Sequence, residues 1–154
     1  MNQIKRILLV DDDINDVELT LTALGENNLL NEVIVVHDGE KALDYLYRQG
    51  DFRMRADANP AVVLLDLKMP KVDGLEVLRK IRADEQLRLI PVVILTSSRE
   101  ERDLVDGYKL GVNAYVVKPV DFEQFTEAIQ HLGIFWSLIN EPVPEILNKR
   151  NTKN

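Results

Sequence analysis

Short runs of consecutive apolar residues alternate with amphipathic segments along most of the chain. The apolar runs lie near residues 5–10, 33–37, 61–66, 91–96 and 114–117 and are rich in valine, isoleucine and leucine. Continuous apolar runs of this length are typical of strands that are buried on both faces of a sheet. The pattern therefore predicts five buried strands.

After each run, apolar residues recur at the three- and four-residue spacing of an α-helix. The positions are Val17, Leu21 and Leu24; Ala42, Leu43, Leu46 and Tyr47; Leu75, Leu78 and Ile81; Leu104, Val105 and Tyr108; and Phe122, Phe125, Ile129 and Leu132. Five βα units in series predict an α/β fold, a doubly wound five-stranded parallel sheet with helices on both faces.

Composition narrows the class of protein. The chain has 154 residues, of which 45% are hydrophobic and 29% charged, as in a globular domain. A net charge of -7 argues against binding to nucleic acid. The chain has no cysteine, which excludes thiolate metal sites and thiol catalysis. It has no apolar run of membrane-spanning length and no signal peptide, so we expect no membrane partner and a cytoplasmic location.

The same pattern predicts where the domain ends. We expect one folded domain over residues 1–140, including an extended last helix, and a C-terminal tail over residues 141–154 that is disordered at its end. The residues after Gly133 are too few for a second domain.

Polar side chains follow four of the predicted strands at the point where each ends. Asp11 and Asp12 follow the first strand, Asp66 ends the third, Thr96 the fourth, and Lys118 follows the fifth. Because the carboxyl ends of parallel strands lie on one edge of a sheet, we expect these side chains to meet there. Clustered carboxylates repel one another, so they need a cation or their pKa values shift upward. Oxygen ligands without histidine or cysteine favour Mg²⁺.

Such a cluster suits phosphoryl transfer. A carboxylate such as that of Asp66 can act as a nucleophile toward a phosphoryl donor and form an acyl phosphate. The transfer requires positive charge around the phosphoryl group, which Mg²⁺, Lys118 and the Thr96 hydroxyl could provide. Simpler interpretations exist for each residue alone, since Asp66 could be a turn residue and Lys118 a surface lysine, while Ser97 or Ser98 could cap the following helix.

Taken together, these segments resemble the receiver domain of two-component response regulators. The resemblance covers about residues 4–133. It rests on Leu9-Val10-Asp11-Asp12-Asp13, Leu65-Asp66-Leu67-Lys68-Met69-Pro70 with Asp73-Gly74 close behind, Ile94-Leu95-Thr96-Ser97 and Ala114-Tyr115-Val116-Val117-Lys118-Pro119. It implies a flavodoxin-like fold with the strand order 2-1-3-4-5.

The resemblance also implies a role for each site residue. Asp66 would accept a phosphoryl group from a sensor histidine kinase or a phosphotransfer protein, and self-catalysed phosphorylation and dephosphorylation would be the only chemistry. Asp12, Asp66 and the backbone carbonyl of Lys68 would bind Mg²⁺, with Asp11 acting through a water.

The implied switch uses three further residues. Thr96 and Tyr115 would move when Asp66 is phosphorylated, and Lys118 would bind a phosphoryl oxygen. The Lys118-Pro119 bond would be cis.

Several features separate this chain from a typical receiver. Position 68 often carries asparagine in this family and here carries lysine, and position 98 is serine; both flank the path of attacking water in the family. The segment Asn15-Asp16-Val17-Glu18-Leu19, the long loop 50–60 and the pair Phe135-Trp136 resemble stand-alone regulators paired with phytochrome-type and related sensor kinases. We therefore expect a stand-alone receiver, with a phytochrome-type kinase among its candidate partners.

An enzyme is the main alternative function. A phosphatase or phosphotransferase of the haloacid-dehalogenase type also forms an aspartyl phosphate with Mg²⁺. Enzymes of that class have the motif Asp-x-Asp at the nucleophile, whereas the residue two positions after Asp66 in this chain is Lys68. The chain also lacks the glycine-rich phosphate-binding motifs of nucleotide-binding enzymes.

The end of the last helix predicts self-association. Phe135, Trp136, Leu138 and Ile139 continue its apolar stripe. Five helices already cover both faces of the predicted sheet, so the sequence favours a homodimer built around the last helix and Phe135/Trp136. Alternatively, the two aromatic side chains fold back on their own domain.

Overall fold

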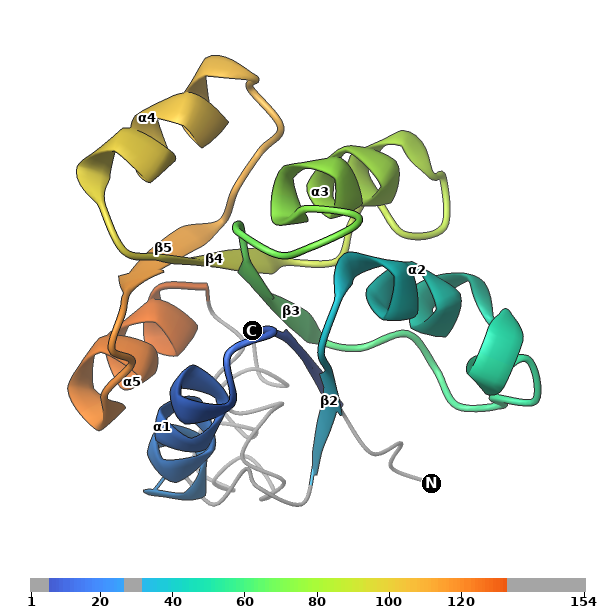
Figure 1. Cartoon of the computed structure of the whole chain (residues 1–154), viewed down its shortest axis with the longest axis horizontal. Coiled ribbons are helices and arrows are strands. Elements are labelled where there is room, and N and C mark those ends of the chain that lie inside the picture. Colours follow the sequence, from blue (N-terminus) through green and yellow to red (C-terminus); the bar gives the residue numbers. More distant parts are fainter. Residues whose placement is uncertain (1–5, 27–31, 133–154) are drawn as a thin grey trace, which may run out of the picture.

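The computed structural model describes residues 6–26 and 32–132. One sheet runs through the molecule, with helices on both sides (Figure 1). Its strands are β1 (Ile7–Val10), β2 (Val33–Val36), β3 (Val62–Asp66), β4 (Val92–Thr96) and β5 (Ala114–Val117). The helices are α1 (Ile14–Glu26), α2 (Gly39–Tyr47), α3 (Gly74–Ala83), α4 (Arg99–Gly107) and α5 (Phe122–Leu132), and a 3-10 turn, η2, covers Gly50–Phe52.

The topology agrees with the sequence-based expectation. All neighbouring strands are parallel, and their order is β2-β1-β3-β4-β5. This confirms the doubly wound parallel sheet and the strand order that the resemblance implies. The strand limits agree with the predicted apolar runs to within two residues.

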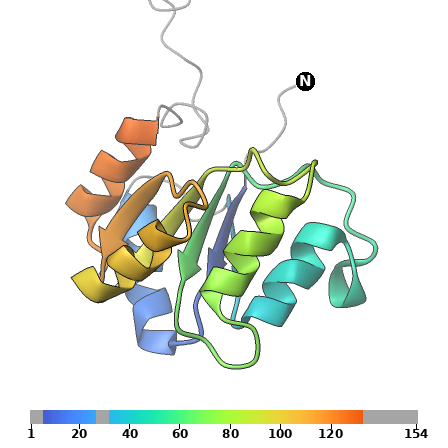
Figure 2. The ribbon, with the colours of Figure 1, turned by 90° about the horizontal axis from the view of Figure 1, so that it is seen from above.

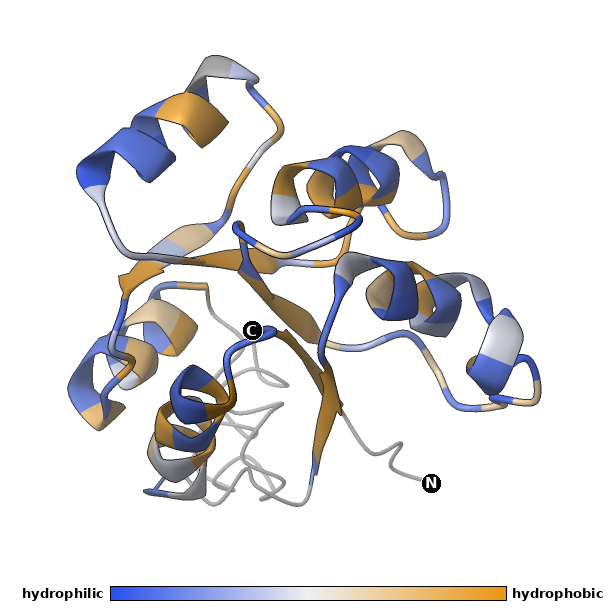
Figure 3. Ribbon diagram, in the orientation of Figure 1, coloured by the Kyte–Doolittle hydropathy of each residue, from blue (hydrophilic) through white to orange (hydrophobic). Residues whose placement is uncertain are grey.

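Apolar side chains fill both faces of the sheet. Leu8 and Val10 of β1 belong to a cluster with buried residues of α2, α3 and α4. Ile7 and Leu9 belong to a second cluster, with buried residues of α1 and α5. Successive side chains of a strand point to opposite faces, so a strand covered on both faces needs apolar residues at every position. Figure 3 shows this as strands that are almost wholly hydrophobic between helices with one polar side.

The parallel arrangement brings polar residues to one edge. Figure 2 shows the strand arrows pointing toward one side of the molecule. Asp66 and Thr96 are the last residues of β3 and β4, while Asp11 directly follows β1 and Lys118 directly follows β5. The fold therefore gathers the expected site residues at the carboxyl edge of the sheet.

Two expectations concern parts of the chain that the structure does not describe. The extended last helix with Phe135 and Trp136, and the division at residue 140, lie outside the described residues. Within residues 6–26 and 32–132, no helix is long and apolar enough to cross a membrane.

Candidate functional site

Three carboxylates meet at the carboxyl edge of the sheet. One oxygen atom from each of Asp11, Asp12 and Asp66 lies within 4.8 Å of the others. Asp11 has no exposed surface, Asp66 is nearly buried, and Asp12 is exposed. Asp12 and Asp66 line an open cavity of about 410 Å³, whereas the fully buried Asp11 does not line it. The geometry brings together the three acids that the sequence identified.

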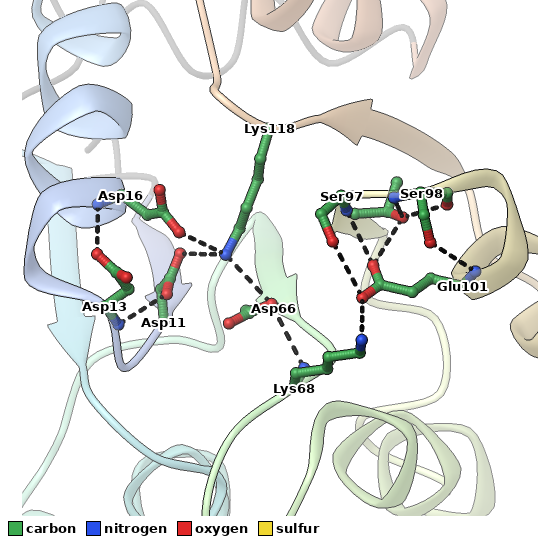
Figure 4. Close-up of polar contacts among 10 residues, drawn as sticks. Asp11, Asp13, Asp16, Asp66, Lys68, Ser97, Ser98, Glu101 and Lys118 are labelled. Carbon is green, nitrogen blue, oxygen red and sulfur yellow. Dashed lines mark hydrogen bonds and ion pairs between the residues drawn. The ribbon is translucent and has the colours of Figure 1, made fainter.

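Lys118 places its ammonium group among carboxylates (Figure 4). Its Nζ atom lies 3.2 Å from Oδ2 of Asp11, 3.2 Å from Oδ1 of Asp66 and 3.0 Å from Oδ2 of Asp16. Burial alone would lower the pKa of Lys118, but the hydrogen bond to Asp16 and the charges of Asp66 and Asp11 raise it overall. The lysine is therefore a permanent cation at the site. The Lys118-Pro119 bond is cis, as expected.

The surroundings of Asp66 disfavour the ionised form of its carboxyl group. Burial, together with the charge of Asp11, raises the pKa of Asp66 from 3.8 to about 6, although Lys118 acts in the opposite direction. Its Oδ1 atom also accepts a hydrogen bond of 3.4 Å from the backbone N–H of Lys68. A further cation beside Asp66 would favour the ionised carboxylate.

The start of α3 lies directly against the backbone of Asp66. The N–H of Gly74 donates to the carbonyl of Leu67 at 2.9 Å. A Cβ atom at Gly74 would lie 2.2 Å from the carbonyl oxygen of Asp66. Asp73 caps the helix by accepting from the N–H of Glu76 at 2.9 Å. The glycine therefore allows the helix to fix the turn that carries Asp66.

Thr96 lies at the same edge, but its hydroxyl is bonded elsewhere. In the sheet register Asp66 is opposite Leu95, so Thr96 follows one residue further along β4. Thr96 is fully buried, and its hydroxyl donates to the carbonyl of Ser98 at 2.8 Å and to Oε2 of Glu101 at 2.9 Å. Among the described residues it makes no hydrogen bond to Asp66.

Ser98 is the residue that caps α4. Its hydroxyl accepts a hydrogen bond of 3.2 Å from the N–H of Glu101. Of the two serines that the sequence offered for this role, Ser98 is therefore the cap. The exposed side chain of Lys68, the other departure from the family pattern, has its Nζ atom 3.4 Å from Oε1 of Glu101.

Tyr115, the second residue of the expected switch, is turned toward α4. Its hydroxyl donates to Oδ1 of Asp106, and the guanidinium of Arg102 lies 4.7 Å from its ring centroid. Burial and the hydrogen bond to Asp106 raise the pKa of Tyr115. In the part of the chain that the structure describes, its polar contacts are with this helix and not with the carboxylate cluster.

Sequence reasoning missed two acids at the site. Glu101 is buried, which would raise its pKa, but hydrogen bonds from Ser97, Thr96 and Lys68 lower that pKa overall. The spacing from Ser98 to Glu101 is that of a capping box and could have identified this acid. Asp16 is 102 residues from Lys118 in the sequence, and no local pattern links the two.

Comparison with known proteins gives a consistent family. The sequence model of the family described as "Response regulator receiver domain" matches residues 7–130 of this chain. The response regulator Rcp1 of Synechocystis sp. is 37% identical over 135 residues, which is 88% of this chain and 90% of Rcp1. A crystal structure of Rcp1 in its Mn²⁺-bound form aligns with a TM-score of 0.69 and 36% identity, covering 91% of this chain and 99% of that one.

Two further solved structures resemble the chain over most of its length. The bacteriophytochrome response regulator RtBRR is 65% identical, with a TM-score of 0.84 over 92% of this chain and 86% of its own. The phosphorylated cyanobacterial phytochrome response regulator RcpA is 37% identical, with a TM-score of 0.70 over 92% of this chain and 99% of its own. This chain therefore belongs to the family of response regulator receiver domains of two-component systems, and its relatives include phytochrome-associated response regulators.

Proposed function

We propose that Asp66 accepts a phosphoryl group from a sensor histidine kinase or a phosphotransfer protein. The observation that carries the proposal is that Asp66 both lines an open cavity and has its carboxylate 3.2 Å from the ammonium of Lys118. Asp11 shares that ammonium but has no exposed surface. Asp12 is exposed but has no such ion pair among the described residues. Of the three acids, Asp66 alone combines access with an adjacent cation.

The proposed reaction is a direct transfer between two side chains. An oxygen of the Asp66 carboxylate attacks phosphorus, the bond from phosphorus to the donor's imidazole nitrogen breaks, and the imidazole leaves with the electron pair. The product is an acyl phosphate on Asp66. Lys118 offsets charge on the phosphoryl oxygens, which is the main protein contribution that such a transfer requires. Self-catalysed phosphorylation and hydrolysis of the acyl phosphate are the only reactions proposed.

The donor set at the site fits a hard divalent cation, and we propose Mg²⁺. Three carboxylate oxygens within 4.8 Å of one another suit an ion that prefers oxygen ligands. Asp12, Asp66 and the backbone carbonyl of Lys68 would hold the ion, with Asp11 acting through a water. The ion would supply positive charge at the reacting carboxylate. The Mn²⁺-bound form of the relative Rcp1 supports the proposal that this chain binds a divalent cation.

We propose that Thr96 and Tyr115 change position in response to the negative charge of the phosphoryl group. On phosphorylation the Thr96 hydroxyl would donate to the phosphoryl group, and Tyr115 would leave its present position. Both residues now contact α4, Thr96 through Glu101 and Tyr115 through Asp106, which supports α4 as the element that responds. The change is a population shift between two arrangements, biased by one charged group.

The kinase and the assembly state are further parts of the proposal. RtBRR is a bacteriophytochrome response regulator, and RcpA is a cyanobacterial phytochrome response regulator. We propose a phytochrome-type histidine kinase as the phosphoryl donor of this chain. We also propose a homodimer that uses the end of the last helix with Phe135 and Trp136, a segment outside the described residues.

Incubation with acetyl phosphate and Mg²⁺, followed by intact mass measurement, tests the function. The wild type should gain one phosphoryl group, and both Asp66→Asn and EDTA treatment should prevent the gain. Persistence of the gain in Asp66→Asn would place the reaction elsewhere. Sustained turnover of small phosphate esters would favour the alternative phosphatase, although Lys68 stands where that class carries its acid.

A further inference from the structure

Glu101 connects three separate parts of the site through one buried carboxylate (Figure 4). Its Oε2 atom accepts from the Thr96 hydroxyl and from the N–H of Ser97, each at 2.9 Å. Its Oε1 atom accepts from the Ser97 hydroxyl at 3.2 Å and lies 3.4 Å from Nζ of Lys68. The start of α4 is thus tied to the end of β4 and to the loop after Asp66.

The Thr96 hydroxyl cannot serve Glu101 and a phosphoryl group at the same time. A hydroxyl has one hydrogen to donate. In this structure that hydrogen is directed to Glu101 and to the carbonyl of Ser98. Donation to a phosphoryl oxygen on Asp66 therefore requires that the bond to Glu101 break.

We propose that Glu101 is a positioning residue that holds Thr96 in its unphosphorylated arrangement and so sets the balance of the switch. The inference rests on the proposed function of Asp66 and Thr96. A phosphoryl group can shift the equilibrium only by its differential interaction with the two arrangements. The hydrogen bonds to Glu101 favour the unphosphorylated arrangement and therefore oppose that shift.

If Glu101 only capped α4, its hydrogen bonds would differ from those observed. In a capping box, the glutamate accepts from the N–H of the capping residue, which here is Ser98. Instead, Glu101 accepts from Ser97, and the N–H of Ser98 donates to the Thr96 hydroxyl oxygen at 3.2 Å. The carboxylate thus engages Thr96 itself, a contact that helix capping does not require.

Titration of the full-length protein with beryllofluoride in the presence of Mg²⁺ tests the inference. Beryllofluoride imitates the phosphoryl group, and the amide resonances of Thr96 and Ser97 report binding. In Glu101→Gln, neutral hydrogen bonds of about half the strength replace the charged ones. The apparent Kd should then fall by roughly tenfold, the factor expected for loss of one charge-assisted bond. The Ser98 hydroxyl can still accept from the backbone N–H at position 101, so α4 should remain folded.

Glu100→Gln is the matched control. Glu100 is exposed in the same helical turn, and the substitution removes the same charge. Its Kd should stay within about twofold of the wild type, since surface charges contribute little. In a Thr96→Ala background, Glu101→Gln should lose most of its effect, because the two substitutions remove one shared interaction.

The direction of the change separates the two roles of Glu101. Tighter binding by Glu101→Gln and by Glu101→Ala, even where Glu101→Ala lowers the melting temperature, supports the inference. Unchanged or weaker binding by a folded Glu101→Gln variant would overturn it. Failure of the proposed function is seen separately, as a wild type that does not bind beryllofluoride or an Asp66→Asn variant that binds it as well as the wild type does.

Discussion

At the scale of the residue, the site holds more negative than positive charge, because three carboxylates contact the single ammonium group of Lys118. Asp11, Asp16 and Asp66 all lie within 3.2 Å of its Nζ atom. The pKa of Asp66 reflects this imbalance, because burial and the charge of Asp11 raise it to about 6. A divalent cation or a phosphoryl group at Asp66 would therefore redistribute charge in the whole cluster.

The pKa of Asp66 predicts a pH-dependent stability for the metal-free protein. Because the folded value of about 6 lies above the ordinary 3.8, the folded state binds this proton more tightly than the unfolded chain does. The stabilisation that this bound proton gives the folded state is fully present below about pH 4 and is lost as the pH rises through about 6. Asp66→Asn, which cannot ionise, should therefore exceed the wild type in unfolding free energy near neutral pH.

The expected difference is about 1–2 kcal/mol near neutral pH, because solvent screening reduces an upper bound of roughly 3 kcal/mol. Near pH 4 the difference should be close to zero. Urea unfolding in EDTA at several pH values measures it, with Glu100→Gln as a control for removal of an exposed acid. A difference that does not change with pH would contradict this account of Asp66.

At the scale of the element, α4 is attached to the domain mainly by polar contacts. Within residues 99–106, Val105 is the one apolar side chain that is buried, while Leu104 is 56% exposed. Hydrogen bonds from Thr96 and Tyr115 reach the helix at Glu101 and Asp106. A helix with little apolar burial is easily displaced when such hydrogen bonds change.

Hydrogen exchange should show this difference between helices. Amides of α4 should exchange faster than those of α3, which buries Val77, Leu78 and Ile81. Beryllofluoride should change protection in α4 more than in α3. Equal protection of the two helices, or a response confined to α3, would argue against α4 as the responding element.

The turn from β3 into α3 makes a second prediction at this scale. Gly74→Ala would force a Cβ atom against the carbonyl oxygen of Asp66, so it should cost about 2–3 kcal/mol of stability and slow phosphorylation. Gly25→Ala is the control, since nothing lies within 4 Å of the added Cβ in α1. That change should stabilise the protein by up to about 1 kcal/mol. Equal effects in chemical unfolding would contradict the close approach at Gly74.

Much of this arrangement follows from the sequence. Consecutive apolar residues locate the strands, because both faces of each strand are covered, and parallel strands bring Asp66 and Lys118 to one edge. Periodicity locates the helices but not their depth of burial. Leu104 and Phe122 belong to predicted apolar stripes, yet they are 56% and 38% exposed. Ser97 and Thr96 lie four and five residues before Glu101, but the ion pair of Glu101 with Lys68 depends on a tertiary contact that no spacing in the sequence specifies.

At the scale of the whole molecule, the described part of the last helix packs against its own sheet. Ile129 of α5 is 1% exposed and packs in the cluster beneath α1 and α5, and Leu132 packs against that cluster. This part of the helical stripe is therefore directed toward its own sheet. A dimer contact would rest on Phe135 and Trp136, which could bury about 300–500 Å². A standard interface buries roughly 800 Å² per partner.

Light scattering at micromolar to tens-of-micromolar concentration tests the dimer. The wild type should have twice the monomer mass, and Phe135→Ala combined with Trp136→Ala should shift it toward the monomer. Phe122→Ala, which truncates an exposed aromatic at the other end of α5, should leave the mass unchanged. A monomeric wild type, with and without beryllofluoride, would contradict the proposal.

Mapping the phosphorylated residue tests the central claim most directly. Borohydride reduces an acyl phosphate to an alcohol, so treatment of the phosphorylated protein converts the modified aspartate to homoserine. Peptide mass spectrometry then distinguishes Asp66 from Asp11 and Asp12, which share the cluster. We predict homoserine at position 66, dependent on Mg²⁺ and absent without the phosphoryl donor. Homoserine at position 11 or 12, with aspartate retained at position 66, would contradict the account.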